Sequence, residues 1–259
     1  MSEGQGHDRP FVAEFGTLRS LQFNGLTVQS VMSIIDPDVL ALDYTRAMMG
    51  FLLFNPRPRH IVMVGLGGGS LAKYCLRTLP DTCFTAVEIS PEVIALRQRF
   101  GIPPDNERFR VVCADGADYV RDGEEAPDVL LVDGFVAAGL PARLGSTDFF
   151  ADCRRALSPG GVLVVNHWAG DGRYAVYAAR LREAFDGRVL AIGAEDGDNR
   201  ISFAFSGTGF PPARGQVLRR CAELAELHSF DVADIAQRVL ARLDRMMAGR
   251  AADTTQDGD

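Results

Sequence analysis

Three acidic side chains stand just after three short apolar segments of the chain. Glu88, Asp115 and Asp133 each follow a run of residues that has the length and composition of a buried strand. In an open sheet of parallel strands, ligands bind at the carboxyl ends of the strands, where such side chains meet. A single carboxylate in this place is commonly a helix cap, but three of them around a glycine-rich loop favour a shared site.

The glycine-rich loop lies between another apolar run and an apolar-periodic helix. It consists of Gly65-Leu66-Gly67-Gly68-Gly69, which follows Ile61–Val64 and precedes Leu71–Leu79. Glycines allow a positive φ and lack the Cβ that would block a ligand. Glu88 follows roughly 20 residues later, where an acid can bind ribose hydroxyls in a nucleotide-binding βαβ unit. The spacing Gly-x-Gly-x-Gly lacks the full diphosphate motif, which favours a ligand with a ribose and no diphosphate, such as S-adenosylmethionine.

The elements that must position these residues alternate along the chain between apolar strands and helices. The expected strands are 61–65, 84–89, 109–113, 129–132 and 162–166, and the expected helices are 70–79, 90–100, 117–121, 147–157 and 174–185. This alternation predicts an α/β fold with a doubly wound, Rossmann-like parallel sheet that helices cover on both faces. Strands at 189–192 and 200–205 are expected to form an antiparallel pair at one edge.

The chain on either side of this region is expected to add smaller elements. Residues 11–35 predict a β-element with a hairpin turn at Asn24-Gly25, and residues 38–54 predict a helix that is capped at Asp36-Pro37-Asp38. Residues 216–247 predict one or two amphipathic helices. The expected boundaries are 1–10 disordered, 11–55 an N-terminal β-hairpin element and helix, 56–207 a Rossmann-like catalytic domain, 208–247 a helical extension and 248–259 a disordered tail.

Composition narrows the range of functions. A hydrophobic fraction of 47% over 259 residues is enough for a sizeable core, and the net charge of −7 argues against nucleic acid or an anionic membrane as a partner. The five cysteines form no Cys-x-x-Cys pair and no cluster with zinc spacing, so we expect reduced thiols and no metal. The sequence has no signal-peptide pattern and no apolar run of about 18 residues. These features predict a cytoplasmic protein.

The motifs between Arg59 and Gly161 resemble those of a known enzyme family in their order and spacing. The matching segments are Val64–Gly69, Val87–Pro91, Asp115–Val120, Asp128–Asp133 and Phe149–Gly161. They resemble the catalytic domain of the spermidine synthases, the polyamine aminopropyltransferases, which is itself similar to class I S-adenosylmethionine-dependent methyltransferases. Upstream, Gly25–Ser30 resembles the strand of this family that carries a ligand-binding glutamine, and Asp43-Tyr44 stands where the family has a tyrosine. The resemblance spans about residues 15–206.

The resemblance implies a methyltransferase-type sheet, a donor and a role for each matched residue. The donor would be decarboxylated S-adenosylmethionine, or S-adenosylmethionine itself, used as a co-substrate. Its binding residues would be Gln29, Tyr44, Gly65, Gly67, Gly69, Glu88, Ile89, Asp115 and Gly116. Glu88 would hold the ribose hydroxyls, and Asp115 would accept a hydrogen bond from the adenine amino group. Asp133 would orient and deprotonate the attacking amine, which must be neutral to react.

The chain departs from the family pattern around both substrates. The aspartate of the family loop Gly-Gly-Gly-Asp-Gly-Gly, which holds the aminopropyl ammonium, is replaced here by Gly68. The Tyr-His/Gln-Glu motif reads Tyr44-Thr45-Arg46, residues 133–137 lack the second acid of the family's Asp-Ser-x-Asp-Pro segment, and residues 193–200 offer no clear counterpart of its late tyrosine. A buried ammonium without a partner is costly, so these losses weaken the case for a dicationic amine. Gly68 would instead leave room for the α-carboxylate of the intact donor.

Three hypotheses are therefore open. The first is a spermidine synthase-like transferase that moves an aminopropyl group to a small-molecule amine, with Asp133 as the base. The second is a methyltransferase that uses intact S-adenosylmethionine on another acceptor, and the third is a catalytically inactive nucleoside-binding homologue. A homodimer is also possible, because residues 217–247 could form an oligomer surface. His167 could act as a further base, although a histidine at a strand end is more often packed against its neighbours.

Overall fold

The computed structural model describes residues 9–23, 27–135 and 139–256 of the chain. Its centre is a seven-stranded sheet with the strand order β6-β5-β4-β7-β8-β10-β9. These strands are β4 (His60–Val64), β5 (Cys83–Glu88), β6 (Phe109–Cys113), β7 (Val129–Val132), β8 (Val162–Trp168), β9 (Val189–Gly193) and β10 (Asn199–Phe205). The strands from β4 to β8 pair in parallel, and β10 is antiparallel to both β8 and β9. The predicted α/β sheet with an antiparallel pair at one edge is confirmed.

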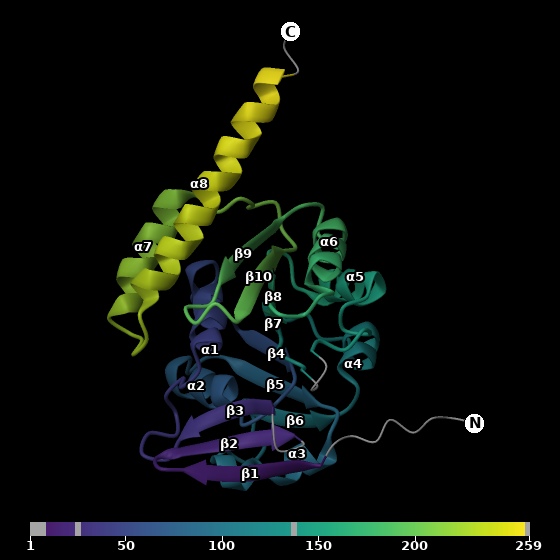
Figure 1. Cartoon of the computed structure of the whole chain (residues 1–259), viewed down its shortest axis with the longest axis vertical. Helices are drawn as coiled ribbons and strands as arrows, with labels where there is room; N and C mark the ends of the chain where they lie inside the picture. Colours follow the sequence, from purple (N-terminus) through teal and green to yellow (C-terminus); the bar gives the residue numbers. More distant parts are fainter. Residues whose placement is uncertain (1–8, 24–26, 136–138, 257–259) are drawn as a thin grey trace, which may run out of the picture.

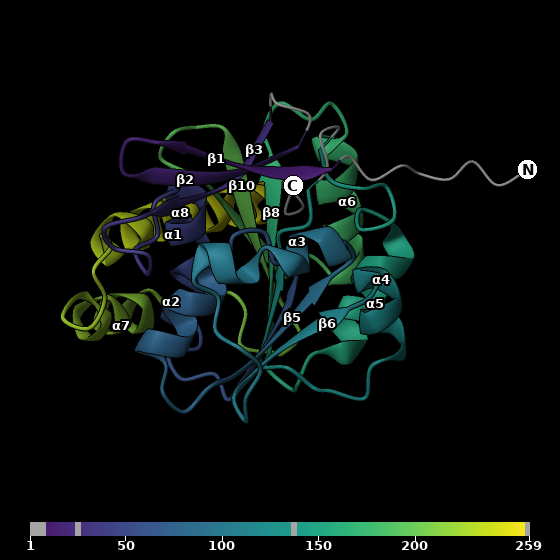
Figure 2. The same cartoon turned by 90° about the horizontal axis from the view of Figure 1, so that it is seen from below.

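Helices cover both faces of this sheet (Figure 1, Figure 2). One face carries α4 (Gly116–Asp122), α5 (Thr147–Ala156) and α6 (Tyr174–Ala184), and the other carries α1 (Asp43–Met48), α2 (Ser70–Thr78) and α3 (Pro91–Ala95). Successive side chains of a strand point to opposite faces. Accordingly, Ile61 and Met63 of β4 belong to one hydrophobic core, whereas Val62 and Val64 belong to the other. The doubly wound architecture therefore follows from strands that are apolar on both faces.

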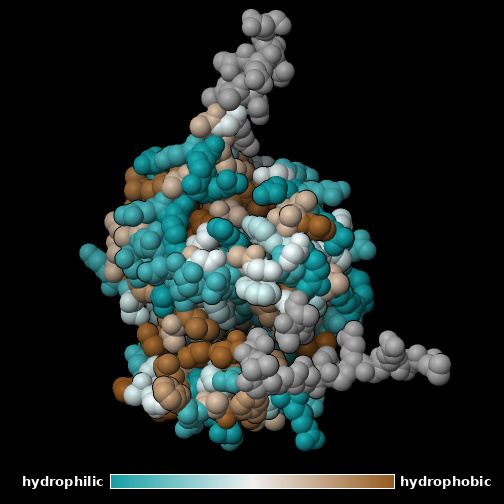
Figure 3. Space-filling view, viewed as in Figure 1, coloured by the Kyte–Doolittle hydropathy of each residue, from teal (hydrophilic) through white to brown (hydrophobic). Residues whose placement is uncertain are grey.

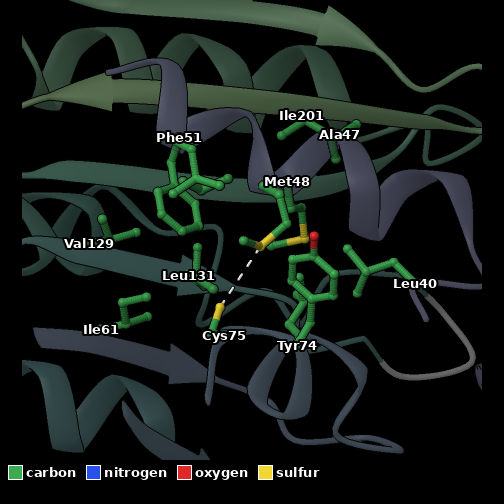
Figure 4. Close-up of a cluster of buried hydrophobic side chains, with 14 of the residues drawn as sticks. Leu40, Ala47, Met48, Phe51, Ile61, Tyr74, Cys75, Val129, Leu131 and Ile201 are labelled. Atoms are coloured by element: carbon green, nitrogen blue, oxygen red, sulfur yellow. Dashed lines mark hydrogen bonds between the residues drawn. The ribbon is translucent and has the colours of Figure 1, made fainter. Parts of the chain in front are cut away.

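The core on the α1 side is built from sulfur and aromatic side chains (Figure 4). Met48 and Phe51 lie above the strand residues Val129 and Leu131, and all four are fully buried. The buried Cys75 thiol of α2 donates a hydrogen bond to the Met49 sulfur over 3.8 Å (Figure 4). Burial raises the pKa of the Cys75 thiol, so this cysteine stays protonated and serves as a small apolar residue.

A separate three-stranded antiparallel sheet precedes the main sheet in the chain. It consists of β1 (Pro10–Phe15), β2 (Leu18–Phe23) and β3 (Thr27–Ser33), in that order. Phe23 of β2 pairs with Thr27 of β3, while the turn that we predict at Asn24-Gly25 lies outside the described residues. This sheet lies beside α2, where the Ser70 hydroxyl donates to the carbonyl oxygen of Val31 at 3.5 Å. Figure 3 shows a band of apolar surface where the small sheet meets the main body.

Two helix predictions need correction. The helix that we expect from residue 38 begins only at Asp43, and a 3₁₀ segment, η1 (Met49–Leu53), continues it. Asp36 does not cap this helix, because its carboxylate instead accepts the backbone N–H of Asp38 at 3.4 Å in a local turn. The helix predicted at 90–100 begins at a Ser90 cap but divides into α3 and a 3₁₀ segment, η2 (Arg97–Phe100).

Two helices follow the main sheet, α7 (Arg214–Ala225) and α8 (Val232–Gln256). They pack against each other, and α8 also contacts β9. The later part of α8 extends away from the body of the protein (Figure 1). Helical structure therefore continues beyond residue 247, where we expected a disordered tail to begin. Within the described part of the chain, no helix combines the length and apolar character that a membrane crossing needs.

Candidate active site

A cavity of about 690 Å³ lies between the small sheet and the carboxyl ends of the main strands. Its volume is in the range of a site for a nucleoside-sized ligand. All predicted site residues except Gly69 line this cavity: Gln29, Tyr44, Gly65, Gly67, Glu88, Ile89, Asp115, Gly116 and Asp133. The structure thus brings together residues from two sheets and from four separate strand ends. It also adds residues that sequence reasoning missed, among them Ser30, Ser90, Arg143 and Arg173.

The glycine loop follows β4 and approaches the end of β7 closely. Gly65 has a φ of +95°, and a Cβ there would lie 2.4 Å from the carbonyl oxygen of Asp133. Only glycine can occupy this position without moving one of the two strand ends. Gly67 also has a positive φ and faces Ser30 of the small sheet. The backbone of this loop is therefore held against both walls of the cavity.

Two loop glycines lie outside the cavity lining, contrary to our expectations. Gly69 is the N-cap residue of α2, and its missing Cβ leaves room for Ile102, so packing against Ile102 accounts for a glycine here. A Cβ on Gly68 would lie 2.7 Å from the Ser30 hydroxyl and 3.0 Å from the Phe100 ring. The prediction that Gly68 opens space for an α-carboxylate is therefore wrong, because protein atoms already fill that space.

Glu88 ends β5 and is held by the backbone on both sides. One carboxylate oxygen accepts the N–H of Leu66 in the glycine loop, and the other accepts the N–H of Ser90, both at 3.0 Å. The side chain is only 8% exposed. A carboxylate offers about four acceptor positions, so the two that remain are available to hydroxyl groups in the cavity. This geometry is compatible with the expected place of Glu88 at a ribose, which stays a prediction.

Asp115 serves the fold and the cavity at the same time. Its Oδ1 caps α4 by accepting the N–H groups of Ala117 at 2.8 Å and Asp118 at 3.2 Å. Its Oδ2 pairs with the guanidinium of Arg143 at 2.6 Å. The helix-cap interpretation of a strand-end carboxylate therefore holds here alongside the site interpretation. Gly116 is required because a Cβ would lie 2.3 Å from a Val64 methyl group.

Asp133 follows β7 and is held by side chains rather than by backbone groups. The amide nitrogen of Asn166 donates to its Oδ1 at 2.9 Å, and the hydroxyl of Tyr44 forms a second hydrogen bond. Asp133 is partly exposed to the cavity but enclosed by protein on its other sides. Burial raises the pKa of Asp133 to about 6, although both hydrogen bonds act in the opposite direction. A carboxyl group with this pKa can accept and release a proton near neutral pH.

The neighbours of Asp133 explain its state. Burial and the charge of Asp133 raise the pKa of Tyr44 well above its usual value, so Tyr44 stays protonated and donates. Asn166 lies near the end of β8, at the last residue of the strand that we expect at 162–166. The side-chain oxygen of Asn166 accepts a hydrogen bond from the side-chain amide of Asn199 at 2.9 Å. Asn199 belongs to the antiparallel strand β10, whose register the sequence does not reveal.

His167 points away from this cluster and does not line the cavity. It is 2% exposed, and neither ring nitrogen has a hydrogen-bond partner among the described residues. The centroid of its ring lies 5.4 Å from that of Tyr174. Burial lowers the pKa of His167 to about 4, so the imidazole is neutral. The packed interpretation of this histidine is the one that the structure supports. Among residues 9–23, 27–135 and 139–256, no three histidine, cysteine or acidic side chains form a metal-binding group.

Comparisons with known proteins agree with this arrangement. Residues 41–169 match the family model described as the spermine/spermidine synthase domain. The chain is 47% identical over 195 residues to a polyamine aminopropyltransferase of Chromobacterium violaceum, with 75% of each chain covered. It is 40% identical over 249 residues to the polyamine aminopropyltransferase of Neisseria meningitidis, which covers 95% of this chain and 90% of the relative.

A solved methyltransferase has the same kind of main sheet. The crystal structure of human methyltransferase-like protein 13 in complex with SAH aligns with a TM-score of 0.65 at 25% identity. The alignment covers 72% of this chain and 92% of that one. The main sheet with its helices is thus of the methyltransferase type.

Proposed function

Because the chain belongs to the spermine/spermidine synthase family, we propose that it is an aminopropyltransferase that moves the aminopropyl group of decarboxylated S-adenosylmethionine to a small-molecule amine. The single observation that carries this proposal is the cluster of Asp133, Tyr44 and Asn166 in the same cavity as Glu88 and the glycine loop. One part of the cavity can bind an adenosyl group, and another holds a carboxylate that can take up a proton.

The donor would lie along the carboxyl ends of β4, β5 and β6. Gly65 and Gly67 present a backbone without side chains, and Glu88 keeps two acceptor positions for the ribose hydroxyls. Asp115, Gly116 and Ile89 border the place for the adenine ring.

The reaction is a displacement at the carbon next to the sulfonium sulfur. The lone pair of the acceptor nitrogen forms the new C–N bond while the C–S bond breaks, and the electron pair of that bond leaves on sulfur as a neutral thioether. Asp133 takes the proton that the amine loses, and its two hydrogen bonds hold the carboxylate in place. The cavity contributes by holding donor and acceptor in contact.

A methyltransferase is the second candidate, and one observation favours it. The SAH complex that resembles this chain belongs to a methyltransferase-like protein. Decarboxylated and intact donors share the adenosyl group, so the residues around Glu88 suit both. The donor's tail, and not the nucleoside, distinguishes the two activities.

Calorimetric titration with decarboxylated S-adenosylmethionine, S-adenosylmethionine and methylthioadenosine tests the proposal, together with mass spectrometry of an amine acceptor after incubation with each donor. We expect the decarboxylated donor to bind and to add an aminopropyl group to the amine. Preference for the intact donor with methyl transfer would move the chain to the second candidate. Binding without any product would indicate an inactive nucleoside-binding homologue, and no binding would refute the roles of Glu88 and Asp115.

The cellular location and the oligomeric state of the protein stay predictions. The cysteines that the structure describes are free thiols, as we expect of a cytoplasmic protein. A homodimer that uses the helical extension around α7 and α8 is the oligomer that the sequence allows. Analytical ultracentrifugation of the whole chain would decide whether such a dimer forms.

A further inference from the structure

The amide group of Asn166 has one orientation that suits Asp133 and one that does not. An ionised carboxylate only accepts hydrogen bonds, so the NH₂ end of Asn166 must face it. The opposite orientation would place the Asn166 carbonyl oxygen against the Asp133 oxygen and repel it. Asn166 is 1% exposed, so water does not compensate for a wrongly turned amide. Whatever fixes this amide therefore also decides how well Asp133 is held in its ionised form.

Asn199 is the group that contacts the other end of this amide. Its Nδ2 donates to the Asn166 carbonyl oxygen at 2.9 Å, and the Asn166 Nδ2 donates to Asp133 at the same distance. Both asparagines lie on one face of the β8–β10 pair, because Asn199 is opposite Trp168, two residues after Asn166. Such diagonal neighbours on antiparallel strands are within reach of each other. The backbone of Asn199 is also held in place, because its main-chain carbonyl oxygen accepts the N–H of Ala194 at 2.8 Å.

We propose that Asn199 is a positioning residue for the reaction, which acts on Asp133 by fixing the orientation of the Asn166 amide. The proposal rests on the proposed function only in that Asp133 is the base. A donor from Asn199 satisfies the Asn166 carbonyl oxygen and leaves the NH₂ end pointing to Asp133. When Asp133 carries a proton, a turned amide could accept that proton in a hydrogen bond, and the donor from Asn199 opposes this turn.

Removal of the Asn199 donor should therefore favour the protonated form of Asp133. Hydrogen bonds to a charged form lower the pKa of a carboxyl group, and Asn166 supplies one of the two that Asp133 receives from the described residues. Tyr44 from α1 supplies the other. The other charged groups that line the cavity are Glu88, Asp115, Arg143 and Arg173. None of them is changed in the variants below, so a shift can be assigned to the amide.

The test compares Asn199→Leu, which has a similar volume and no donor, with Asn166→Leu and the double variant. The pKa of Asp133 is read by NMR titration of ¹³C-labelled aspartate carboxyls, assigned with Asp133→Asn, and the pH profile of turnover is measured in parallel. We expect Asn199→Leu to raise the pKa of Asp133 by about half a unit to one unit. Turnover should fall several-fold on the acidic side of the profile and change little at pH 8.

Three results are decisive. If Asn199 acts through Asn166, its substitution adds nothing in the Asn166→Leu background. An unchanged titration of Asp133 in Asn199→Leu, or an equal further shift in the double variant, would overturn the proposal. If the carboxyl titration shifts but Asp133→Asn retains turnover, the action of Asn199 on Asp133 through Asn166 stands, and the assignment of Asp133 as base fails.

Two further variants guard against a misfolded protein. Asn199→Ser keeps a polar group that is too short to reach Asn166, and it should reproduce the shift of Asn199→Leu. Asp198→Ala changes an exposed residue of the same turn and should leave the profile unchanged. A shift in Asp198→Ala of the same size would show that the turn, and not the amide, controls Asp133.

Discussion

Two carboxylates that both end a strand of the same sheet are held in different ways. Backbone N–H groups of Leu66 and Ser90 bind the two oxygens of Glu88. Asp133 is bound instead by the side chains of Asn166 and Tyr44, which come from β8 and α1. The first arrangement depends only on the path of the main chain, whereas the second depends on side chains that other elements must bring into place.

This difference matches the proposed division between ligand binding by Glu88 and proton transfer by Asp133. A carboxylate that is fixed by backbone donors has a constant geometry, which suits the recognition of a ribose. A carboxylate that is enclosed by side chains loses water, and burial raises the pKa of Asp133 to about 6. Its proton affinity can then be adjusted by a single hydrogen bond, which suits a general base. The following substitutions probe this division of roles.

Asp133→Asn should have the largest effect, because it removes the base and keeps the shape of the side chain. We expect turnover to fall about 10²- to 10⁴-fold, with donor affinity unchanged within a factor of about two in calorimetric titration. Asp128→Asn is the matched control, since Asp128 lies at the opposite end of β7 and accepts the N–H of Arg59. Equal loss of donor binding and turnover in Asp133→Asn would contradict a separate base.

Glu88→Gln should act on the other side of the comparison and reduce binding. An amide nitrogen cannot accept a hydrogen bond and the remaining amide oxygen is uncharged, so the ribose hydroxyls of the donor lose a charged acceptor. Hydrogen bonds to charged groups contribute about 1.5–3 kcal/mol, which corresponds to a donor affinity lower by about 10- to 100-fold. Turnover at saturating donor should be nearly normal. Glu125→Gln, outside the cavity lining, is the control, and an unaltered donor affinity in Glu88→Gln would remove it from the ribose site.

Tyr44→Phe should shift the pH dependence rather than abolish activity. The base must be ionised, so turnover should fall about tenfold per pH unit below the Asp133 pKa of about 6. The Tyr44 hydroxyl lowers that pKa, so its removal should move the acidic limb upward by about one unit. Turnover measured from pH 5 to 9 gives the acidic limb and the activity above it, with Tyr119→Phe as the control. A limb that stays in place would show that Tyr44 does not stabilise the Asp133 carboxylate.

Gly68→Ala should have the smallest effect on catalysis and act mainly on stability. The new methyl group would lie 2.7 Å from the Ser30 hydroxyl and 3.0 Å from Phe100. Overpacking of this kind costs about 1–3 kcal/mol, which thermal unfolding would show as a lower Tm. Gly172→Ala is the control, because no described atom beyond its own chain neighbours lies within 4 Å of its added methyl group. A Gly68→Ala variant as stable as the wild type would mean that Ser30 and Phe100 yield easily.

Much of the nucleoside half of the site could be predicted from the sequence. Glu88, Asp115 and the glycine loop follow apolar strands directly, and parallel strands bring their carboxyl ends to one edge. The start of the helix predicted at 90–100 is local in the same way, because the Ser90 hydroxyl caps it by accepting the N–H of Val93 at 3.2 Å. Local reasoning failed where two signals competed, as at Asp36, which forms a local turn instead of capping the following helix.

Only the tertiary structure decided what surrounds each of these residues. The positions of Gly68 and Gly69 look equivalent to Gly67 in the sequence, yet Phe100, Ile102 and Ser30 from distant segments fill the space beside them. The environment of Asp133 likewise depends on how α1, β8 and β10 pack.

The physical reason for this division is the range of the interactions. Strand periodicity, caps and strand-end acids are local and can be read from neighbouring residues. Burial and long-range hydrogen bonds arise only when separate segments meet. The sequence could therefore name Asp133 as a candidate base through the family resemblance, but it could not give the surroundings of this residue. The burial that raises the pKa of Asp133 and the Asn199–Asn166 contact that opposes this rise both depend on the packed structure.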